Sequence, residues 1–422
     1  MIQLPFLREN KELIKERYNK RQLDASETID EILKLDDKRK STQQEMDDQL
    51  ADANKMAKQI GELFKNGQAA EGNQLREKSK GLKESSNLLK DKLKEIEEQQ
   101  IALLYQLPNV PHEKVPAGKS EEDNQIIFTE GEAVSFSHQA LPHWELASKH
   151  GLIDFETGVK ITGAGFPLYQ GKGAKLQRAL INFFLDEADK AGYQEVIPPL
   201  LVNEASGIGT GQLPDKEGQM YHVTADDLYL IPTAEVPITN IYRDEIVKSS
   251  DFPIKNCGYT PCFRREAGSY GKDVRGLNRL HQFDKVEIVQ ITHPDKSAEA
   301  LDGMIEHIKS MLEKLDLHYR IALLCGGDLG FAAAITYDFE VYSAAQEKWL
   351  EVSSVSNFET YQANRLKLRF KNENGKTELV HTLNGSALAL PRILAALLEN
   401  NQTEEGITIP EALIPYTGFE KI

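Results

Sequence analysis

The chain has 422 residues, of which 40% are hydrophobic and 27% charged, a composition typical of a globular protein large enough for two or three domains. Its formal net charge of −16 excludes a generally basic nucleic-acid binder, because such proteins neutralise phosphates with Lys and Arg, but local basic patches remain compatible with it. The three cysteines form no CxxC pair, and there is neither a signal-like N-terminal run nor a bilayer-length apolar stretch, so we expect a cytoplasmic protein without structural zinc or membrane contact.

The first third of the chain predicts helices. Residues 1–25 are expected to form a short helical element with Leu4, Leu7, Leu13 and Tyr18 as anchors. In residues 26–106 two runs of apolar residues recur at alternating steps of four and three: Met46, Leu50, Ala53, Ala57, Ile60 and Phe64, then Leu75, Leu82, Leu89, Leu93, Ile96 and Leu103. Asn66-Gly67 and Gly72-Asn73 interrupt the rhythm, which predicts an antiparallel helical hairpin with a weak register between Leu35 and Met46.

Each arm of this hairpin has about 35–40 residues and would be roughly 50–60 Å long. Its second arm is rich in positive charge: Arg76, Lys78, Lys80, Lys83, Lys90, Lys92 and Lys94. Two interpretations stay open. The charges form a solvated coiled-coil face, or they contact phosphates along an RNA helix with little base specificity.

Residues 107–124 are proline-punctuated and polar, and the domain boundary is predicted there. A helix is expected at 173–191, followed by a strand at 195–197 and Pro198. The segment 193–202 is apolar enough for a core strand or for burial against a second subunit. Further on, Thr233-Ala234-Glu235 lies between two prolines in an apolar segment; alone it predicts a turn, and its carboxylate would need a partner.

The most informative stretch is CGYTPCFRREAGSYGKDVRGLNRLHQFDKVEIV, residues 257–289. It predicts a strand through Cys262 and Phe263 and a return strand at 281–289. The loop between them contains three glycines and three basic residues: Gly268, Gly271, Gly276, Lys272, Arg275 and Arg279.

Strand alternation places Phe283, Lys285 and Glu287 on one face of the return strand, and Arg264 and Glu266 on one face of the outgoing strand. Charges on an apolar sheet face are costly unless they meet a ligand or each other. Phe283 could stack on a purine, Arg264 could hold a phosphate, and Glu287 could accept hydrogen bonds from an ammonium group. The alternative is a hairpin whose charges form internal salt bridges.

The last part of the chain predicts a packing helix at 296–315, with Ala300, Met304, Ile308, Met311 and Leu315 facing inward. After a glycine-rich loop and a strand, Glu351, Ser353 and Ser354 combine a carboxylate with hydroxyls, a set that suits Mg²⁺. The final element reads as a strand, a turn at Asn384-Gly385 and a buried helix. Arg392 in this helix reaches solvent or meets a phosphate or an adenine.

FRREAG with the following basic loop and HQFDKVEIV closely resembles the second signature motif of class II aminoacyl-tRNA synthetases, in the form found in seryl-tRNA synthetases. The region ending at Pro198 resembles the first motif and the region around Arg392 the third. The resemblance implies an α+β fold with two domains. Residues 1–108 would be a tRNA-binding domain carrying an antiparallel two-helix coiled-coil arm at about 26–106. Residues 109–422 would be a catalytic domain built on a mainly antiparallel sheet flanked by helices.

The same resemblance implies ATP-dependent activation of L-serine to seryl-adenylate and its transfer to the 3′ end of tRNA(Ser), with Mg²⁺ and a homodimer; whether tRNA(Sec) is also charged stays open. Arg264 at the α-phosphate and Arg392 at the γ-phosphate would be the catalytic residues. The implied serine site comprises Thr233, Ala234, Glu235, Arg264, Glu287, Asn384 and Ser386. The implied ATP site comprises Arg264, Arg265, Glu266, Leu280, Phe283, Glu351, Val352, Ser353, Ser354 and Arg392, and Glu351 and Ser354 would bind the metal.

Three residues depart from the family pattern: Ala387 and Pro391 stand where glycines are common, and Arg265 stands where serine is common. Pro391 could make the helix of Arg392 begin late. Two other functions remain to be separated. One is an amino-acid-activating homologue that passes its acyl group to a carrier protein and would lack the hairpin. The other is a coiled-coil scaffold joined to a nucleotide-binding module, which would have no activity.

Overall fold

The computed structural model describes residues 1–215, 218–266 and 275–422. Gly268, Gly271 and Lys272 of the predicted loop lie outside the described residues. The chain divides into two compact units. One comprises Ile2–Glu16 and Asp24–Pro108, and the other comprises Met1, Arg17–Leu23 and Asn109–Ile422.

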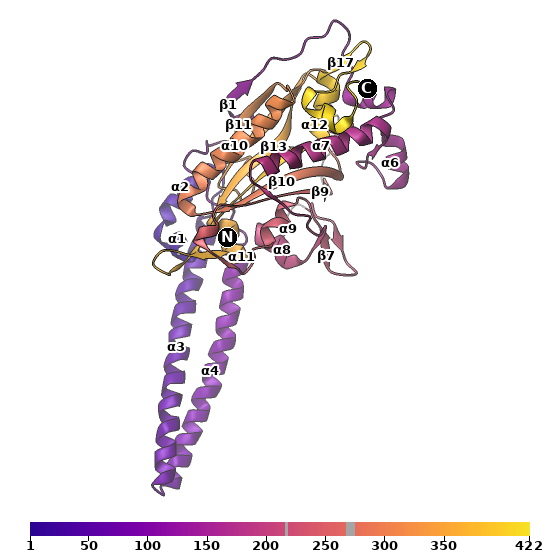
Figure 1. Cartoon of the computed structure of the whole chain (residues 1–422). Helices are drawn as coiled ribbons and strands as arrows, with labels where there is room; N and C mark the ends of the chain where they lie inside the picture. The colour runs from indigo at the N-terminus through magenta and orange to yellow at the C-terminus, as the bar shows by residue number, and fades with distance from the viewer. Residues whose placement is uncertain (216–217, 267–274) are drawn as a thin grey trace. The chain divides into compact units, whose positions relative to one another are not determined.

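The first unit contains α1 (Leu4–Glu9), most of α2 (Lys11–Asn19) and two long antiparallel helices, α3 (Ser26–Lys65) and α4 (Ala69–Leu104), as Figure 1 shows. With 40 and 36 residues, these two helices are roughly 60 and 54 Å long. The predicted hairpin is therefore confirmed. Buried polar residues occupy the stretch of weak register, where Asp36 and Thr42 lie, and further buried polar residues on α4 are Ser79, Ser86 and Gln100. The Gln100 amide donates to the carbonyl of Ile32 at 3.2 Å.

Two local expectations for this unit are wrong. Gly72 does not interrupt the helices: it lies inside α4, where a Cβ would come within 3.1 Å of the Phe64 ring, so a glycine there allows close packing. The turn is at Gly67, whose φ of +77° favours glycine. Leu13 is 38% exposed and is no anchor, whereas its neighbour Ile14 is fully buried.

The second unit is built on an eight-stranded sheet in which all neighbouring strands are antiparallel except the pair β4·β9. In spatial order its strands are β1 (Gln125–Glu130), β11 (Tyr319–Leu323), β12 (Ile335–Ser343), β13 (Lys348–Glu359), β16 (His381–Ala389), β10 (Gln282–Thr292), β9 (Ile254–Phe263) and β4 (Gln194–Glu195). The expected α+β class with a mainly antiparallel sheet is confirmed.

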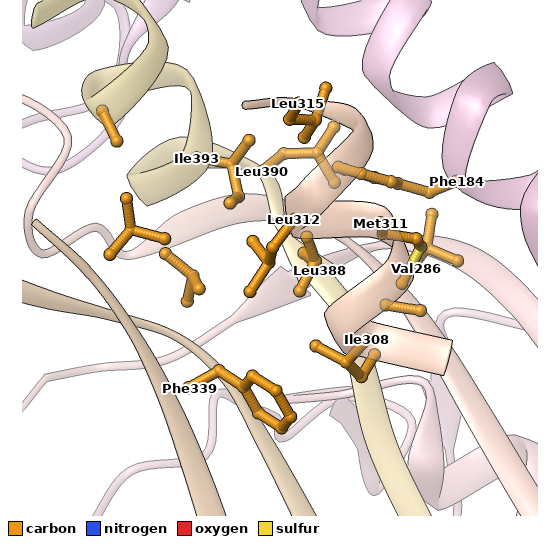
Figure 2. Packing of buried hydrophobic residues seen from close by; sticks show 14 of the residues in the cluster. Phe184, Val286, Ile308, Met311, Leu312, Leu315, Phe339, Leu388, Leu390 and Ile393 are labelled. Atoms are coloured by element: carbon orange, nitrogen blue, oxygen red, sulfur yellow. The ribbon is translucent and has the colours of Figure 1, made fainter. Parts of the chain in front are cut away.

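The main core lies between this sheet and α7 (Gly171–Lys190), α10 (Ser297–Lys314) and α12 (Leu390–Asn400). Figure 2 shows Phe184 of α7, Met311 and Leu312 of α10, and Ile393 of α12 in this packing. The inward face expected for α10 is confirmed, since Met304, Ile308 and Met311 are fully buried.

A second layer comprises α8 (Glu204–Thr210), α9 (Glu235–Asn240) and α11 (Thr360–Leu366). Val289 of β10 packs with Ala234 and Ile238, whereas its neighbours Val286 and Ile288 point into the main core. Because successive strand residues alternate between faces, odd-numbered Glu287 and Val289 point toward α9. The second layer therefore covers the sheet face that carries the charged residues.

The remaining elements are short. They are α5 (His143–Lys149), α6 (Phe155–Ile161), α13 (Ile414–Thr417), β2 (Ile153–Asp154), β3 (Leu168–Tyr169), β5 (Leu201–Val202), β6 (His222–Val223), β7 (Leu228–Leu230), β8 (Ile246–Val247), β14 (Arg369–Lys371), β15 (Thr377–Leu379), β17 (Gln402–Thr403) and β18 (Gly406–Ile407). Within the described parts of the chain, every helix is too short or too polar to cross a membrane.

Near the C-terminus the structure corrects two predictions. Asn384 and Gly385 form no turn; they lie in the middle of β16, paired with Val289 and Ile288 of β10. Helix α12 does not begin late, because it starts at Leu390 with Pro391 in its first turn, where a missing N–H costs nothing.

The strand expected at 195–197 ends at Glu195, and Ile197 is 89% exposed.

Candidate active site

The β9–β10 hairpin brings the predicted aromatic and arginine together. Strand β9 ends at Phe263, so Arg264 and Glu266 lie beyond it, and the alternation rule used to place them on one face does not apply. Glu266 even has a φ of +49°. Arg264 nevertheless turns back: its Cζ lies 5.3 Å from the centroid of the Phe283 ring, and its Nε donates to the carbonyl of Pro232 at 3.3 Å. The guanidinium thus bridges the return strand and the TAE segment.

Beside this pair lies a group of buried charged side chains. Lys285 Nζ lies 2.5 Å from Glu287 Oε2 and donates to Thr233 Oγ1 at 2.9 Å. Glu235 Oε1 accepts from the Gln362 amide at 2.6 Å. Glu235, Glu287 and Lys285 are each at most 6% exposed. The carboxylate of the TAE segment therefore has the partner that it required in Gln362, and Thr233 contacts Lys285 of β10.

The pKa values of both buried glutamates are raised. Desolvation and the nearby charge of Glu287 raise the pKa of Glu235 to about 7. Desolvation also raises the pKa of Glu287, against the charges of Lys285 and Arg264 that favour its ionised form. A ligand ammonium placed here would stabilise both carboxylates, so the group is suited to an amino acid.

Sheet register adds the predicted residues of β16. Glu287 pairs with Ser386 and Val289 with Asn384, so Ser386 and Asn384 share the face of Glu287. Val355 of β13 pairs with Gly385, which sets Ser354 beside Ser386 on the next strand. The sheet therefore aligns a hydroxyl-rich row next to the buried carboxylates.

Arg392 occupies the other end of the site. It is neither free in solvent nor unpaired: its Nη1 donates to the Glu351 carbonyl at 2.7 Å and lies 3.2 Å from Glu351 Oε2. Its Nε donates to the carbonyl of Asn278 at 3.3 Å. Desolvation alone would raise the pKa of Glu351, but the guanidinium charges of Arg392 and Arg264 lower it below its ordinary value.

The oxygen atoms around Glu351 fit a hard cation. Ser354 Oγ donates to Glu351 Oε1 at 3.3 Å, and Ser354 pairs across the ladder with Asp338 of β12. Within the described residues, Asp338 Oδ1 is buried without a hydrogen-bond partner. Desolvation and the charge of Glu351 hold the pKa of Asp338 well above its ordinary value. A Mg²⁺ ion would supply the missing ligand contact and offset the repulsion between the two carboxylates.

Other residues implied for the nucleotide site have less direct positions. Arg265 is exposed, and Glu266 Oε2 accepts from Arg279 Nη1 at 2.9 Å. The side chains of Leu280 and Val352 are buried in the main core, so only their backbone is available to a ligand. Ser353 Oγ donates to the carbonyl of Ser386 at 2.6 Å and so ties β13 to β16.

Sequence reasoning missed three residues of this site. Lys285 was placed on the face of Glu287 but given no role, although its spacing of two from Glu287 was a usable signal. Gln362 lies 127 residues from the Glu235 that it contacts, and no pattern in the sequence joins them. Asp338 lies in a segment whose sequence predicts only a strand, and its place in the site depends on the pairing of that strand with β13.

Comparison with known proteins gives consistent matches along the chain. Residues 1–111 match the family model of the seryl-tRNA synthetase N-terminal domain, and residues 221–401 match that of the tRNA synthetase class II core domain (G, H, P, S and T). A serine–tRNA ligase of Salinibacter ruber is 52% identical over 424 residues, covering 100% of this chain and 99% of the relative.

Solved structures agree. Seryl-tRNA synthetase from Pyrococcus horikoshii, complexed with ATP, superposes with a TM-score of 0.93 at 35% identity and covers 100% of this chain and 99% of that one. The cytoplasmic serine–tRNA ligase from Naegleria fowleri, in complex with AMP, gives a TM-score of 0.87 at 28% identity, with 98% and 96% covered.

Proposed function

This chain belongs to the seryl-tRNA synthetase family, and we propose from that premise that its second unit activates L-serine with ATP and passes the seryl group to tRNA(Ser). The observation that carries the proposal is the connected group formed by Phe283, Arg264, Thr233, Lys285 and Glu287. It joins a stacking surface and a guanidinium to a buried carboxylate.

In the proposed first step, the carboxylate oxygen of serine attacks the α-phosphorus of ATP, the bond to the bridging oxygen breaks, and pyrophosphate leaves. In the second step, a hydroxyl of the 3′-terminal ribose of the tRNA attacks the seryl carbonyl and AMP leaves. Neither step needs a protein nucleophile. Positioning of two bound substrates and fixed positive charge near the phosphates supply the rate enhancement.

Each substrate group has a matching partner. The ammonium of serine lies against Glu235 and Glu287, and its hydroxyl lies near Thr233, Asn384 and Ser386. A site that hydrogen-bonds this hydroxyl rejects alanine, because alanine leaves buried polar groups unpaired.

The adenine stacks on Phe283, with Glu266 at its edge. Arg264 holds the α-phosphate and Arg392 the γ-phosphate.

Mg²⁺ is the cation that we propose beside Glu351 and Ser354, with Asp338 as a further oxygen ligand. When bound, it neutralises charge on the triphosphate. Arg392 contacts Glu351 in the described structure, so the carboxylate that would hold the metal also orients the arginine.

The first unit is proposed to bind tRNA. The exposed residues Arg76, Lys80, Lys83, Lys90 and Lys94 recur at helical spacing along α4, each directly after a residue of the seam, and we call them the basic stripe. Such a stripe contacts phosphates on successive turns of an RNA helix and gives affinity with little base specificity. The proposed domains are 1–108 for tRNA binding and 109–422 for catalysis.

The chain is further proposed to act as a cytoplasmic homodimer. Ile197 and Leu201 follow β4 in the segment that resembles the first class II motif, and they are 89% and 40% exposed in the single chain. A second copy would cover them.

The experiment that tests the function is ATP–pyrophosphate exchange screened across all amino acids, followed by charging of tRNA(Ser). We expect serine-dependent exchange and stable seryl-tRNA. A carrier-linked activating enzyme would show exchange without charging, although the long hairpin already disfavours it. A non-enzymatic scaffold would show no exchange with any amino acid, and that result would refute the proposal.

A further inference from the structure

A buried histidine–glutamate pair lies outside the residues used so far. His143, the first residue of α5, and Glu399, near the end of α12, are both fully buried. Glu399 Oε1 accepts from the backbone N–H of His143 at 2.8 Å and lies 2.6 Å from its Nδ1. Glu399 Oε2 accepts from Ser343 Oγ. Every oxygen of this carboxylate therefore has a donor, as a buried charge requires.

The partners of the His143 ring assign its tautomer. Nδ1 faces a carboxylate oxygen, so it carries the proton and donates. Nε2 lies 2.8 Å from the backbone nitrogen of Leu277, which can only donate, so Nε2 is an acceptor. Glu399 thus fixes the tautomer that lets His143 hold the Leu277 amide.

This amide lies in the segment 275–280, which leads from the glycine-rich loop into β10. A Cβ at Gly276 would lie 2.2 Å from His143 Nε2, so the segment approaches the ring as closely as glycine allows. A second strut runs through Gln346, whose amide donates to Glu399 Oε1 at 2.8 Å and whose carbonyl oxygen accepts from the Asn278 side chain at 2.9 Å.

The segment in turn supports Arg392, because the carbonyl of Asn278 accepts from Arg392 Nε at 3.3 Å. Arg392 and Glu399 lie about two turns apart on the same helix. Helix α12 therefore contributes both Glu399, whose carboxylate anchors the segment through His143, and Arg392, which the segment orients.

We propose that His143 and Glu399 are positioning residues for the nucleotide site, which hold the segment 275–280 so that the Asn278 carbonyl orients Arg392 toward ATP. This inference rests on the proposed role of Arg392 in binding ATP. It predicts that a change in either core residue weakens the binding of ATP. The binding of serine should not change, because the serine contacts lie at the other end of the site.

The test compares His143→Ala with His307→Ala by kinetics of pyrophosphate exchange and by equilibrium binding of ATP. His307 serves as the control, since it is a half-buried histidine that lies on α10 away from these contacts. For His143→Ala we expect kcat/KM for ATP to fall roughly ten- to a hundredfold, as for a misplaced catalytic group, while KM for serine stays unchanged. For His307→Ala we expect lower thermal stability and unchanged kinetic constants for ATP. Unchanged ATP binding and kinetics in His143→Ala, or an equal rise in KM for both substrates, would overturn the inference.

Conservative variants keep the test decisive if His143→Ala does not fold. Glu399→Gln retains an oxygen for the two His143 donors and an amide that can donate to Ser343, so it should keep wild-type ATP affinity, whereas Glu399→Ala should lose it. Gly276→Ala pushes a methyl group against His143 Nε2 and should weaken ATP binding. Gly276 has a φ of +63°, so an alanine strains the backbone in both backgrounds, but the clash with the ring is absent in His143→Ala and the effect should be smaller there. Additive effects would mean that the two residues act independently and would reject the network.

Failure of the proposed function gives a different result from failure of the role proposed for His143. If the wild-type chain binds ATP but shows no exchange with serine, the assigned reaction is wrong. The ATP-binding comparison of the variants still decides the role of His143 in that case.

Discussion

The guanidinium of Arg264 lies over the ring of Phe283, with 5.3 Å between Cζ and the ring centroid. This cation–π contact covers the surface on which an adenine would stack. Arg264 must therefore move off the ring, or share it edge-on, when ATP binds. Because its Nε is held by the carbonyl of Pro232, the guanidinium can turn toward the α-phosphate without leaving the TAE segment.

Arg264→Ala is expected to reduce serine-dependent pyrophosphate exchange about a hundredfold or more, since it removes charge stabilisation at the transferring phosphoryl group. Arg264→Lys should recover little of this activity, because a lysine lacks the rigid fork of donors. Arg369→Ala, a change at a partly exposed arginine of β14, serves as the control and should leave exchange unchanged. Near-normal exchange by Arg264→Ala would refute the role given to this residue.

The raised pKa of Glu235 makes stability depend on pH. Its pKa is about 7 in the folded chain against an ordinary 4.5, so between these values the folded state binds more protons than the unfolded state. The free energy of unfolding therefore falls as pH rises from about 4.5 to 7, by about 3 kcal/mol at most. Glu235→Gln should remove this part of the pH dependence, which urea unfolding of both proteins at pH 5 and pH 7.5 measures.

The raised pKa of Glu235 also predicts that the affinity for serine depends on pH. Since an ammonium favours ionised Glu235, the affinity for serine should rise between pH 6 and pH 8 in the wild-type chain. In Glu235→Gln this rise should shrink. An equal rise in both proteins would assign the pH dependence to another group.

Asp338→Asn tests whether Asp338 binds the cation or stabilises the fold. We expect the Mg²⁺ concentration for half-maximal exchange to rise about tenfold or more, because a metal ligand is weakened. The thermal midpoint in Mg²⁺-free buffer should not fall, because the change removes a buried carboxylate that repels Glu351. Asp328→Asn, a nearby exposed change, should alter neither quantity. A lower midpoint with an unchanged Mg²⁺ requirement would show that Asp338 is a structural residue.

Charge reversal on the basic stripe tests the arm. Lys83→Glu with Lys90→Glu should raise KM for tRNA in charging. It should also reduce the salt dependence of this KM, because a protein that makes fewer phosphate contacts releases fewer counterions when it binds. Pyrophosphate exchange should stay at the wild-type rate. Lys78→Glu with Lys92→Glu changes the same net charge on another face of α4 and is the matched control. Equal effects of the two pairs would indicate general electrostatics rather than a defined face.

Much of the architecture follows from local patterns. The heptads of α3 and α4, the strands around FRREAG and the apolar face of α10 are readable because the backbone period alone decides which side chains share a face. The alternation rule did not hold for Arg264, because this residue lies beyond the end of β9. A second rule, that glycines mark turns, was wrong for Gly72 and Gly385, which lie within regular elements.

The sequence by itself therefore determined the two-helix arm, the one strand pair around FRREAG and the residues that resemble a known adenylate-forming site. Only the tertiary structure decided which buried polar groups meet: Gln362 with Glu235 across 127 residues, and Glu399 with His143 across 256. The physical reason is that periodicity acts over a few residues, whereas the partner of a buried charge is set by strand order, register and helix packing. A buried charge must find its hydrogen bonds somewhere, but only the folded chain brings the donor within reach.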